Sequence, residues 1–250
     1  MLRELRTTRG APSVLAHRGG AGPWRENTLE AFAGARSLGA DGVELDARLT
    51  GEGEVVVHHD AEVASSDGDS PLLICATARK DLPDWVPGIE EAVAACSGML
   101  LDVEIKLDVP SGAGRVDPGV CRALTSGLAE VLSRRGDVVV SSFWPDALTA
   151  FSELAPGIAT GLLVHPAVDA AACVATAANL GCSSLLPHFE AVNLELVERC
   201  HQSGLQVGTW TVNDAPDVVG VLAAKVDCVI TDHVSLALGE RNRIRRSRHR

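Results

Sequence analysis

Short apolar runs alternate with longer alanine-rich stretches along most of this chain. The runs are rich in leucine and β-branched residues, and they predict nine strands. These lie near residues 14–17, 42–47, 54–58, 99–106, 137–142, 158–163, 183–187, 206–211 and 227–231. Helical stretches separate most of them, an alternation that is typical of a parallel sheet covered by helices. No low-complexity linker interrupts the pattern, so we expect one α/β domain.

Nine strands are one more than an eight-stranded α/β barrel contains. The link RLTGEG, residues 48–53, is much shorter than the dozen or so residues that a parallel crossover needs. The runs 42–47 and 54–58 must therefore form an antiparallel hairpin. The predicted fold is a single (β/α)8 TIM barrel with an extra antiparallel hairpin strand after strand 2. An open doubly wound sheet is the alternative, but no G-x-G-x-x-G follows the first strand.

The stretch TLEAFAGARSLG is the first predicted helix. Asn27 directly precedes it and is a residue type that caps helix N-termini, so we expect it to be the cap. We also expect Leu29, Phe32 and Ala33 to share the buried face. Gly39 should end the helix, because glycine readily adopts the left-handed conformation found after the last turn.

Composition is ordinary for a globular protein, with 46% hydrophobic and 22% charged residues among 250. The seven cysteines are odd in number, widely spaced and without a C-x-x-C pair, so we expect them to be reduced and mostly buried. No apolar signal region follows MLRELRTTRG, and no run approaches the roughly 18 apolar residues of a spanning helix. These features predict a cytoplasmic protein.

Charge is distributed unevenly along the chain. The last ten residues hold six arginines and no acidic residue, whereas elsewhere 16 lysines and arginines face 33 acidic residues, a net charge of −17. Such a body should repel nucleic acid and anionic membranes, so we expect neither a nucleic-acid partner nor stable membrane association. We divide the chain into an N-terminal extension (1–12), the barrel (13–240) and a basic disordered tail (241–250). The alternative for the tail is a phosphate or membrane tether.

Two predicted strands carry charged residues at matching positions. In GADGVELDARL, Glu44 and Asp46 are two apart, so both carboxylates point to the same side, and in LLDVEIKLD the same holds for Glu104 and Lys106. Inside a buried strand such charges are costly unless they are paired or hold a metal. Three carboxylates form a hard, oxygen-rich site that suits Mg²⁺ or Ca²⁺ better than zinc. Alternatively, these residues are solvated strand or edge positions.

Two histidines flank this acidic cluster. His17 ends the first predicted strand, at the end where barrel enzymes keep their chemistry. If the hairpin turns at residues 51 and 52, the numbers of opposed residues sum to about 103, which pairs His59 with Glu44. Two histidines beside a carboxylate cluster suit a general acid and a general base.

The neighbours of these histidines extend the candidate site. His58 should face the other way and serve a structural role, while Asp60 is a candidate to orient His59. Arg18 follows His17 directly, and its planar guanidinium fits a phosphate group. Lys106 can add a point charge.

At these residues the chain resembles the glycerophosphodiester phosphodiesterase family, a group of TIM-barrel enzymes similar to phosphatidylinositol-specific phospholipase C. Eight sequence blocks occur in family order across nearly the whole chain. They are HRG (17–19), ENTLEAF (26–32), G-A-D-x-x-E-x-D (39–46), V-x-H-D (57–60), E-I-K (104–106), SF (142–143), W-T-V-N (210–213) and I-T-D (230–232).

The resemblance implies a function and a role for each candidate residue. The implied reaction is the metal-dependent hydrolysis of small glycerophosphodiesters to sn-glycerol 3-phosphate and an alcohol, in lipid and glycerol metabolism. The implied ligands of one divalent cation are Glu44, Asp46 and Glu104; the implied acid/base pair is His17 and His59; the implied phosphate and substrate contacts are Arg18, Lys106 and Trp210. Glu26 and Asn27 resemble the pair that supports the first loop.

The chain departs from the family pattern in two places, and these leave other functions open. Arg25 stands where proline is usual, and the segment after Asp60 reaches the helix at Ile89 in fewer than about thirty residues. The preferred alcohol is therefore open. A phospholipase D-like activity on lysophospholipids or sphingolipids is the main alternative; it needs an apolar groove, for which residues 72–74 and Trp85 are candidates. An inactive phosphate- or lipid-binding module is a third interpretation, which predicts a missing ligand or histidine.

Overall fold

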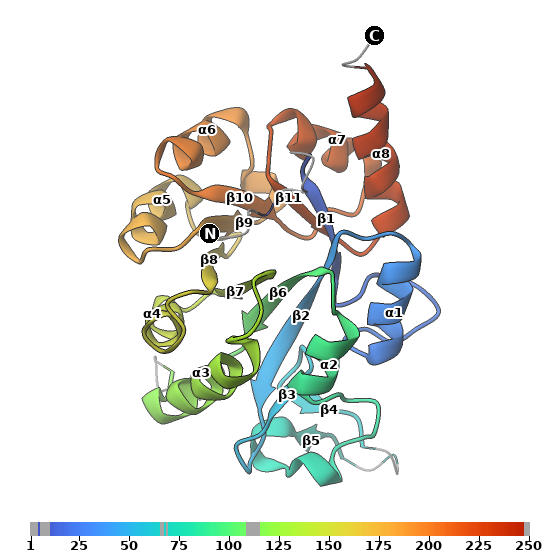
Figure 1. The fold of residues 1–250 in the computed structure, drawn as a ribbon, viewed down its shortest axis with the longest axis vertical. Coiled ribbons are helices and arrows are strands. Elements are labelled where there is room, and N and C mark those ends of the chain that lie inside the picture. Colours follow the sequence, from blue (N-terminus) through green and yellow to red (C-terminus); the bar gives the residue numbers. More distant parts are fainter. Residues whose placement is uncertain (1–4, 6–10, 66–67, 69, 109–115, 248–250) are drawn as a thin grey trace.

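The computed structural model describes residues 5, 11–65, 68, 70–108 and 116–247. Eight parallel strands occupy the centre and helices surround them (Figure 1). The strands follow the order β1-β11-β10-β9-β8-β7-β6-β2, and β1 also pairs with β2, which closes the ring. The predicted barrel is therefore confirmed.

The barrel strands coincide with eight of the nine predicted runs. Their bounds are β1 (Ser13–His17), β2 (Gly42–Leu49), β6 (Leu100–Ile105), β7 (Val138–Ser142), β8 (Ala159–Val164), β9 (Ser184–Pro187), β10 (Gln206–Thr209) and β11 (Cys228–Thr231). The surrounding helices are α1 (Leu29–Ser37), α2 (Ile89–Ala95), α3 (Pro118–Leu132), α4 (Pro145–Leu154), α5 (Ala170–Asn179), α6 (Leu194–Gln202), α7 (Ala215–Ala223) and α8 (Val234–Ser247), with a short 3-10 turn η3 (Phe189–Ala191) before α6.

The ninth run is the extra strand β3 (Val55–Val57), which pairs antiparallel with β2 as predicted. Its predicted register is wrong by one residue, because Ala47 lies opposite Val57 and the paired numbers sum to 104. The turn holds one more residue than expected, and Gly53 accommodates it with a φ of 87°. Since β3 ends at Val57, His59 lies beyond the strand and is not paired with Glu44.

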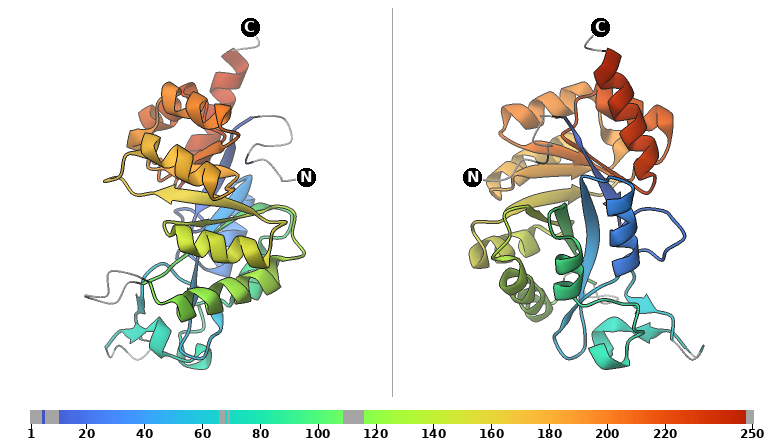
Figure 2. Two further views of the ribbon diagram at one scale, coloured as in Figure 1. Left: turned by 90° about the vertical axis from the view of Figure 1, so that its left-hand side faces the viewer. Right: turned by 45° about the vertical axis from the view of Figure 1, so that its right-hand side comes forward.

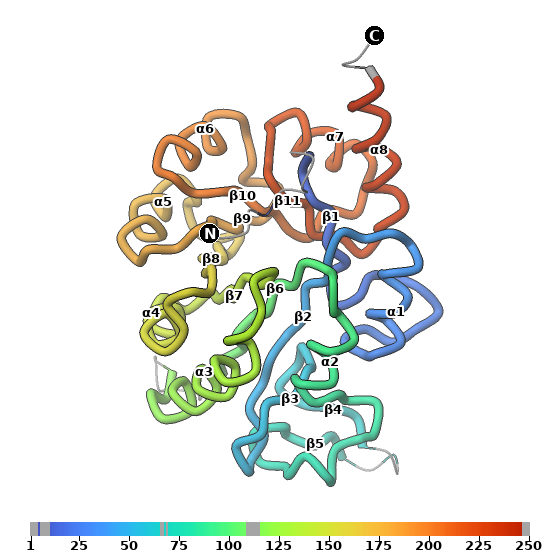
Figure 3. Tube along the Cα trace, viewed as in Figure 1, coloured from blue at the N-terminus to red at the C-terminus, as the bar shows by residue number. Residues whose placement is uncertain are grey.

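A small unit follows β3 and lies at one end of the molecule (Figures 1 and 3). It contains β4 (Glu62–Val63), β5 (Leu72–Leu73) and two 3-10 turns, η1 (Ile74–Ala76) and η2 (Arg79–Asp81). Its apolar side chains form a separate core of Val56, Val63, Ile74, Leu82 and Val86, against which Leu72 and Trp85 pack. Most of the residues that we considered as a groove for an apolar substrate are therefore consumed by this core.

Helix α1 begins one residue later than we predicted. The side chain of Thr28 accepts a hydrogen bond from the backbone of Ala31 and caps the helix, whereas Asn27 has a φ of 55° and serves the active site. Leu29 and Ala33 are exposed, so the predicted face is also wrong. The buried residues are Ala31, Phe32, Gly34 and Ala35. Gly39 follows the helix with a φ of 80°, as predicted.

Two apolar cores lie on either side of the barrel strands. The larger one lies between the strands and the helices. The smaller one fills the barrel interior and consists of Leu5, Leu15, Val139, Ala159, Leu163, Leu186, Cys228 and Ile230. Leu5 donates its backbone N–H to Gln206 and accepts a hydrogen bond from Ser13, which start β10 and β1, so it closes the N-terminal end of the barrel.

The seven cysteines are free, and five of them are buried, as expected. Burial raises the pKa of the Cys200 thiol to about 11 and that of Cys96 to about 12. These thiols therefore act as small apolar residues of the core.

Helix α8 continues to Ser247 and projects beyond the barrel (Figure 2). The prediction of disorder from residue 241 is therefore wrong as far as Ser247, and residues 248–250 lie outside the described part. Arg241 donates to the carbonyl oxygen of Pro12 at 2.9 Å and pairs with Asp41, while Ile244 packs against the larger core. Among the described helices, none is long and apolar enough to cross a membrane.

Candidate active site

The three predicted metal ligands meet at the C-terminal end of the barrel strands. Asp46 on β2 is the direct partner of Glu104 on β6, and Glu44 lies two residues earlier on the same face of β2. One carboxylate oxygen from each residue lies within 4.8 Å of the other two. All three side chains are buried, with residue exposures of 5% for Glu44, 1% for Asp46 and 8% for Glu104. The alternative of solvated edge positions is therefore wrong.

The oxygen atoms and charges of this cluster fit a divalent cation. Asp46 Oδ1 is buried and has no hydrogen-bond partner, so it is left without a donor. Asp102 adds a fourth buried carboxylate beside the three candidate ligands, and Arg18 and Lys106 are the basic side chains that contact the cluster. When all four carboxylates are ionised, two negative charges remain. A hard divalent cation would neutralise them.

Without a cation the cluster resists ionisation. Burial raises the pKa of Glu104 to about 7, and it does the same for Asp102. Burial, followed by the nearby charges of Asp46 and Glu104, also raises the pKa of Glu44 well above its ordinary value. Packing carboxylates this closely therefore stores electrostatic repulsion that a bound cation would relieve.

Asp46 differs from its neighbours because cations and donors surround it. Burial favours a higher pKa, but Lys106 and Arg18 outweigh it and hold the pKa of Asp46 below its usual value. Lys106 Nζ lies 3.5 Å from Asp46 Oδ1 and 2.9 Å from Glu104 Oε1, and Arg18 Nε lies 3.3 Å from Asp46 Oδ2. Asn27 donates to the same Oδ2 atom at 2.7 Å. Asp46 is thus the ionised anchor of the cluster.

His17 is held at the end of β1 by a carboxylate on the other side of the barrel closure. Its Nδ1 lies 2.8 Å from Oδ1 of Asp232, and because a carboxylate only accepts, Nδ1 carries the hydrogen. The Nε2 atom lies 4.0 Å from Glu44 Oε2. Asn213 in turn donates to Asp232 Oδ2 at 2.6 Å. We did not predict the role of Asp232, although its position directly after the last strand was a usable signal.

His59 reaches the same pocket from a loop. Its Nδ1 lies 2.7 Å from Oδ1 of Asp60, so the orienting partner is the predicted one. The backbone oxygen of His59 accepts hydrogen bonds from Arg48 Nε at 2.8 Å and Nη2 at 2.6 Å, and Arg48 also pairs with Asp108. Arg48 therefore positions His59, which strand pairing does not.

The environment of His59 favours its neutral form. Burial lowers the pKa of this imidazole, and the positive charges of Lys106 and Arg18 act in the same direction. The attraction of Asp46 opposes these effects but does not outweigh them. A neutral imidazole whose Nδ1 donates to a carboxylate has an accepting Nε2 atom.

His58 points away from this chemistry, as predicted. Its ring centroid lies 5.7 Å from that of Trp85, and its Nδ1 lies 3.0 Å from the backbone oxygen of Asp60. The guanidinium of Arg25 lies 3.9 Å from the Trp85 ring centroid on another side. The residue that replaces the usual proline thus links the first loop to the segment after β3 through a cation–π contact.

The first loop wraps around the acidic cluster. Arg18 has a φ of 52°, and its backbone N–H donates to Glu44 Oε2 at 3.1 Å. Its guanidinium donates to Glu26 at 3.0 Å, and its backbone oxygen accepts from the N–H of Asn27 at 2.8 Å. Glu26 and Asn27 therefore support this loop as the resemblance implied.

One pocket, with a volume of about 210 Å³, gathers seven of the eight predicted site residues. Only Asp46 lies behind the lining. Trp210 borders the pocket beside Phe143, and their ring centroids are 5.5 Å apart in an edge-to-face arrangement. The indole N–H of Trp210 donates to the carbonyl oxygen of Leu186 at 2.8 Å, so the ring meets the substrate side with its apolar surface. No predicted ligand or histidine is missing, which argues against an inactive binding module.

A closed α/β barrel with clustered carboxylates, two histidines and two cationic side chains at its C-terminal mouth defines a hydrolase of anionic esters. Residues 17–236 match the glycerophosphoryl diester phosphodiesterase family, and the chain therefore belongs to this family of phosphoric diester hydrolases. A glycerophosphodiester phosphodiesterase from Caldanaerobacter subterraneus subsp. tengcongensis is 30% identical over 234 residues, covering 88% of this chain and 93% of the relative.

Two solved structures support the same assignment. A phosphodiesterase from Oleispira antarctica, in complex with the product sn-glycerol-3-phosphate, is 26% identical with a TM-score of 0.80; the match covers 93% of this chain and 97% of that one. A glycerophosphodiester phosphodiesterase from Thermotoga maritima is 27% identical with a TM-score of 0.75, covering 91% and 97%.

Proposed function

We propose that this enzyme hydrolyses glycerophosphodiesters to sn-glycerol 3-phosphate and an alcohol, with one divalent cation held by Glu44, Asp46 and Glu104. The convergence of these carboxylates with His17 and His59 in one pocket carries the proposal. The product bound to the Oleispira antarctica relative supports the same substrate class. The hard oxygen ligands favour Mg²⁺ or Ca²⁺.

Arg18 and Lys106 would hold the phosphate of the substrate. Both side chains line the pocket on the side of the acidic cluster, so their positive charges reach an anionic group placed between the histidines. When bound, the cation supplies further stabilisation of the charge that develops on the phosphoryl oxygens. Trp210 would border the alcohol or glycerol side.

The two histidines would divide the proton transfers. His59 is the general base in this proposal, because its pKa is lowered and its Nε2 atom is an acceptor. It removes the proton from the attacking hydroxyl, which belongs to water or to the glycerol unit. His17 then donates a proton to the oxygen of the leaving alcohol. A second hydrolysis step opens the cyclic phosphate if the glycerol hydroxyl attacks.

A chelation experiment tests the role of the cation. Protein treated with chelator and then supplied with Mg²⁺ or Ca²⁺ is assayed for release of glycerol 3-phosphate from glycerophosphocholine, glycerophosphoethanolamine and glycerophosphoinositol. We expect activity to disappear with chelator and to return with one of the two ions.

The matched variant is the double substitution Glu44→Ala, Asp46→Ala, which should abolish stoichiometric cation binding in a calorimetric titration. Glu90→Ala serves as the control, because Glu90 is an exposed glutamate on α2. Retained cation binding in the double variant, or full turnover in chelator, would contradict the assignment.

A further inference from the structure

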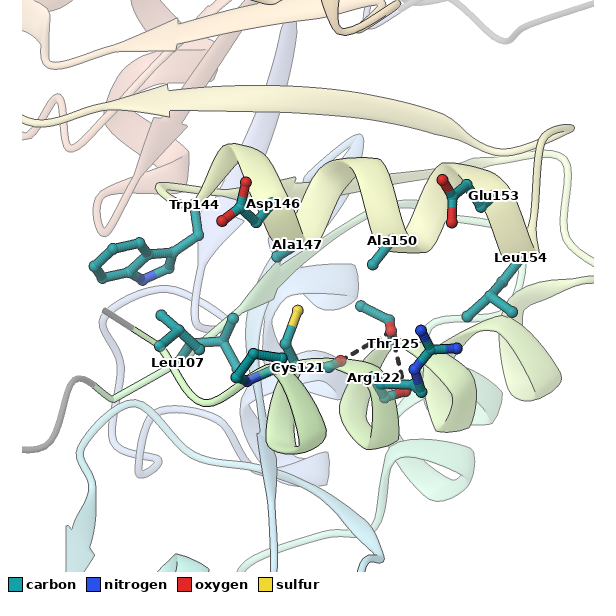
Figure 4. A pocket seen from close by; sticks show the side chains of 12 residues that line it. Leu107, Cys121, Arg122, Thr125, Trp144, Asp146, Ala147, Ala150, Glu153 and Leu154 are labelled. Carbon is teal, nitrogen blue, oxygen red and sulfur yellow. Dashed lines mark hydrogen bonds between the residues drawn. The ribbon is translucent and has the colours of Figure 1, made fainter. Parts of the chain in front are cut away.

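A groove runs between α3 and α4 on the outside of the barrel (Figure 4). Its cavity has a volume of about 500 Å³, within the usual range for small-molecule sites. Leu107 and Cys121 line one side, while Trp144, Ala147 and Ala150 line the other. Because α4 has ten residues, the groove follows a helix of roughly 15 Å.

This groove is continuous with the mouth of the active site. Leu107 directly follows the phosphate-binding candidate Lys106, and Trp144 lies between the end of β7 and the start of α4. Both residues also line a smaller cavity of about 260 Å³, and His59 and Lys106 line that cavity too. A molecule held between the histidines can therefore extend past Trp144 into the groove.

The chemistry of the groove favours a neutral hydrocarbon chain. Its walls are apolar along their length, and Leu154 continues the apolar surface at the far end of α4. The charged residues Asp146, Glu153 and Arg122 also belong to the lining, with the two carboxylates on α4. Carboxylates there oppose an anionic chain end. The segment after β3 offers no comparable surface, since its apolar residues pack into their own core.

We propose that the α3–α4 groove binds a single acyl or alkyl chain attached to the glycerol of the substrate. The inference rests on the proposed function and specifies its substrate class as lysoglycerophospholipids. The bond that breaks is unchanged: the hydroxyl of water joins the phosphorus, and the departing alcohol takes the proton. The products are an acylglycerol phosphate and the free headgroup alcohol. A chain on the terminal glycerol carbon leaves the neighbouring hydroxyl available.

A chain-length series tests the groove. Soluble phosphocholine diesters with hexanoyl, octanoyl and decanoyl chains are compared with glycerophosphocholine, all below their micelle concentrations, by release of choline. Burial of one methylene gives a preference of up to about fourfold, so kcat/KM should rise stepwise with chain length. Equal kcat/KM across the series would overturn the proposal.

Filling the groove supplies the matched variant. Ala150→Trp should lower kcat/KM for the decanoyl substrate by about tenfold or more and leave glycerophosphocholine hydrolysis within about twofold. Thr149→Trp is the control, because Thr149 is the preceding, exposed residue of α4 and is not part of the groove lining. Equal losses on both substrates would contradict the proposal.

A second variant covers the case in which Ala150→Trp does not fold. Leu154 is 48% exposed, so Leu154→Glu should preserve the fold and reduce turnover of the decanoyl substrate more than that of the hexanoyl one. An unchanged chain preference would count against the groove. If neither glycerophosphocholine nor any chain-bearing diester is hydrolysed with Mg²⁺ or Ca²⁺, the proposed function itself fails. A concentration-dependent dimer that Ala150→Trp abolishes, without chain preference, would instead identify the groove as a subunit interface.

Discussion

The two histidines of the site are held in different ways. His17 belongs to the barrel: it ends β1, and its partner Asp232 has a side-chain exposure of 33% and is itself held by Asn213. His59 belongs to a loop, and the side chain of its partner Asp60 is 74% exposed. The first histidine is therefore oriented by the fold, whereas the second is oriented by a few local contacts. Catalytic geometry should depend on distant residues in the first case and on neighbouring residues in the second.

Removing either imidazole should have the largest effect of the substitutions that separate these two halves. We expect His17→Ala and His59→Ala each to lower kcat by about 10² to 10⁴, with cation binding and fold retained, because acid/base groups typically contribute this much. The acidic limb of the pH–rate profile should disappear in His59→Ala, and the alkaline limb in His17→Ala. Activity like that of the wild type in either purified variant would remove that residue from the pair.

The partners of the histidines should show the contrast most directly. Asp232→Asn should lower kcat by about 10- to 100-fold, because the amide no longer fixes the hydrogen on Nδ1 of a partly buried imidazole. Asp60→Asn should cost less, because water can replace an exposed partner. Asp84→Asn, an exposed carboxylate, is the control. Equal losses for the two partners would show that the loop orients its histidine as strictly as the barrel does.

Cation affinity should depend on pH through the acidic cluster that both halves share. Burial raises the pKa of Glu104 to about 7 in the cation-free protein, so protons compete with the cation below that pH. The affinity measured by calorimetry should fall by up to about tenfold per pH unit below 7.

The same shift has a stability consequence with the opposite sign. A raised folded-state pKa stabilises the cation-free fold below the ordinary pKa of glutamate, and this contribution is lost as pH rises through about 7. The melting temperature without cation should therefore fall as pH rises through about 7, and Glu104→Gln should flatten that dependence. An unchanged slope in Glu104→Gln would contradict the assignment.

Shortening the C-terminal helix should give the smallest effect, and only on stability. A chain that stops at Glu240 loses the contacts of Arg241 with Pro12 and Asp41 and the packing of Ile244, which together support the start of β1. We expect a loss of roughly 1–3 kcal/mol in unfolding free energy, which corresponds to about 2–4 °C per kcal/mol in melting temperature. A chain that stops at Ser247 is the control. Equal melting temperatures for the two chains would show that this half of the barrel does not need the helix end.

The metal cluster was predictable because strand periodicity alone aligns Glu44, Asp46 and Glu104. The register of the hairpin was not, because an extra turn residue at Gly53 changes it by one without leaving an unambiguous signal. His59 reached the pocket for a different reason, since its backbone is held by Arg48. The pairing of His17 with Asp232 spans 215 positions and depends on barrel closure.

Helix α8 illustrates a pattern hidden by charge. Val234, Ala237, Arg241 and Ile244 share one helical face, but arginines on both sides of Ile244 disguise it as a polar tail. The groove between α3 and α4 was also beyond the sequence, because it arises from how two helices pack side by side. Apolar residues in a sequence show what can be buried, and the fold decides what stays accessible.

The closed end of the barrel has a practical consequence for attaching the enzyme to a support. Leu5 contacts the starts of β1 and β10, and α8, which runs antiparallel to the strands, ends toward the same side. The histidines and carboxylates open on the opposite side. Any segment joined before Leu5 or after Ser247 therefore leaves the molecule away from the mouth. An enzyme immobilised through either end would present its catalytic face to the solution.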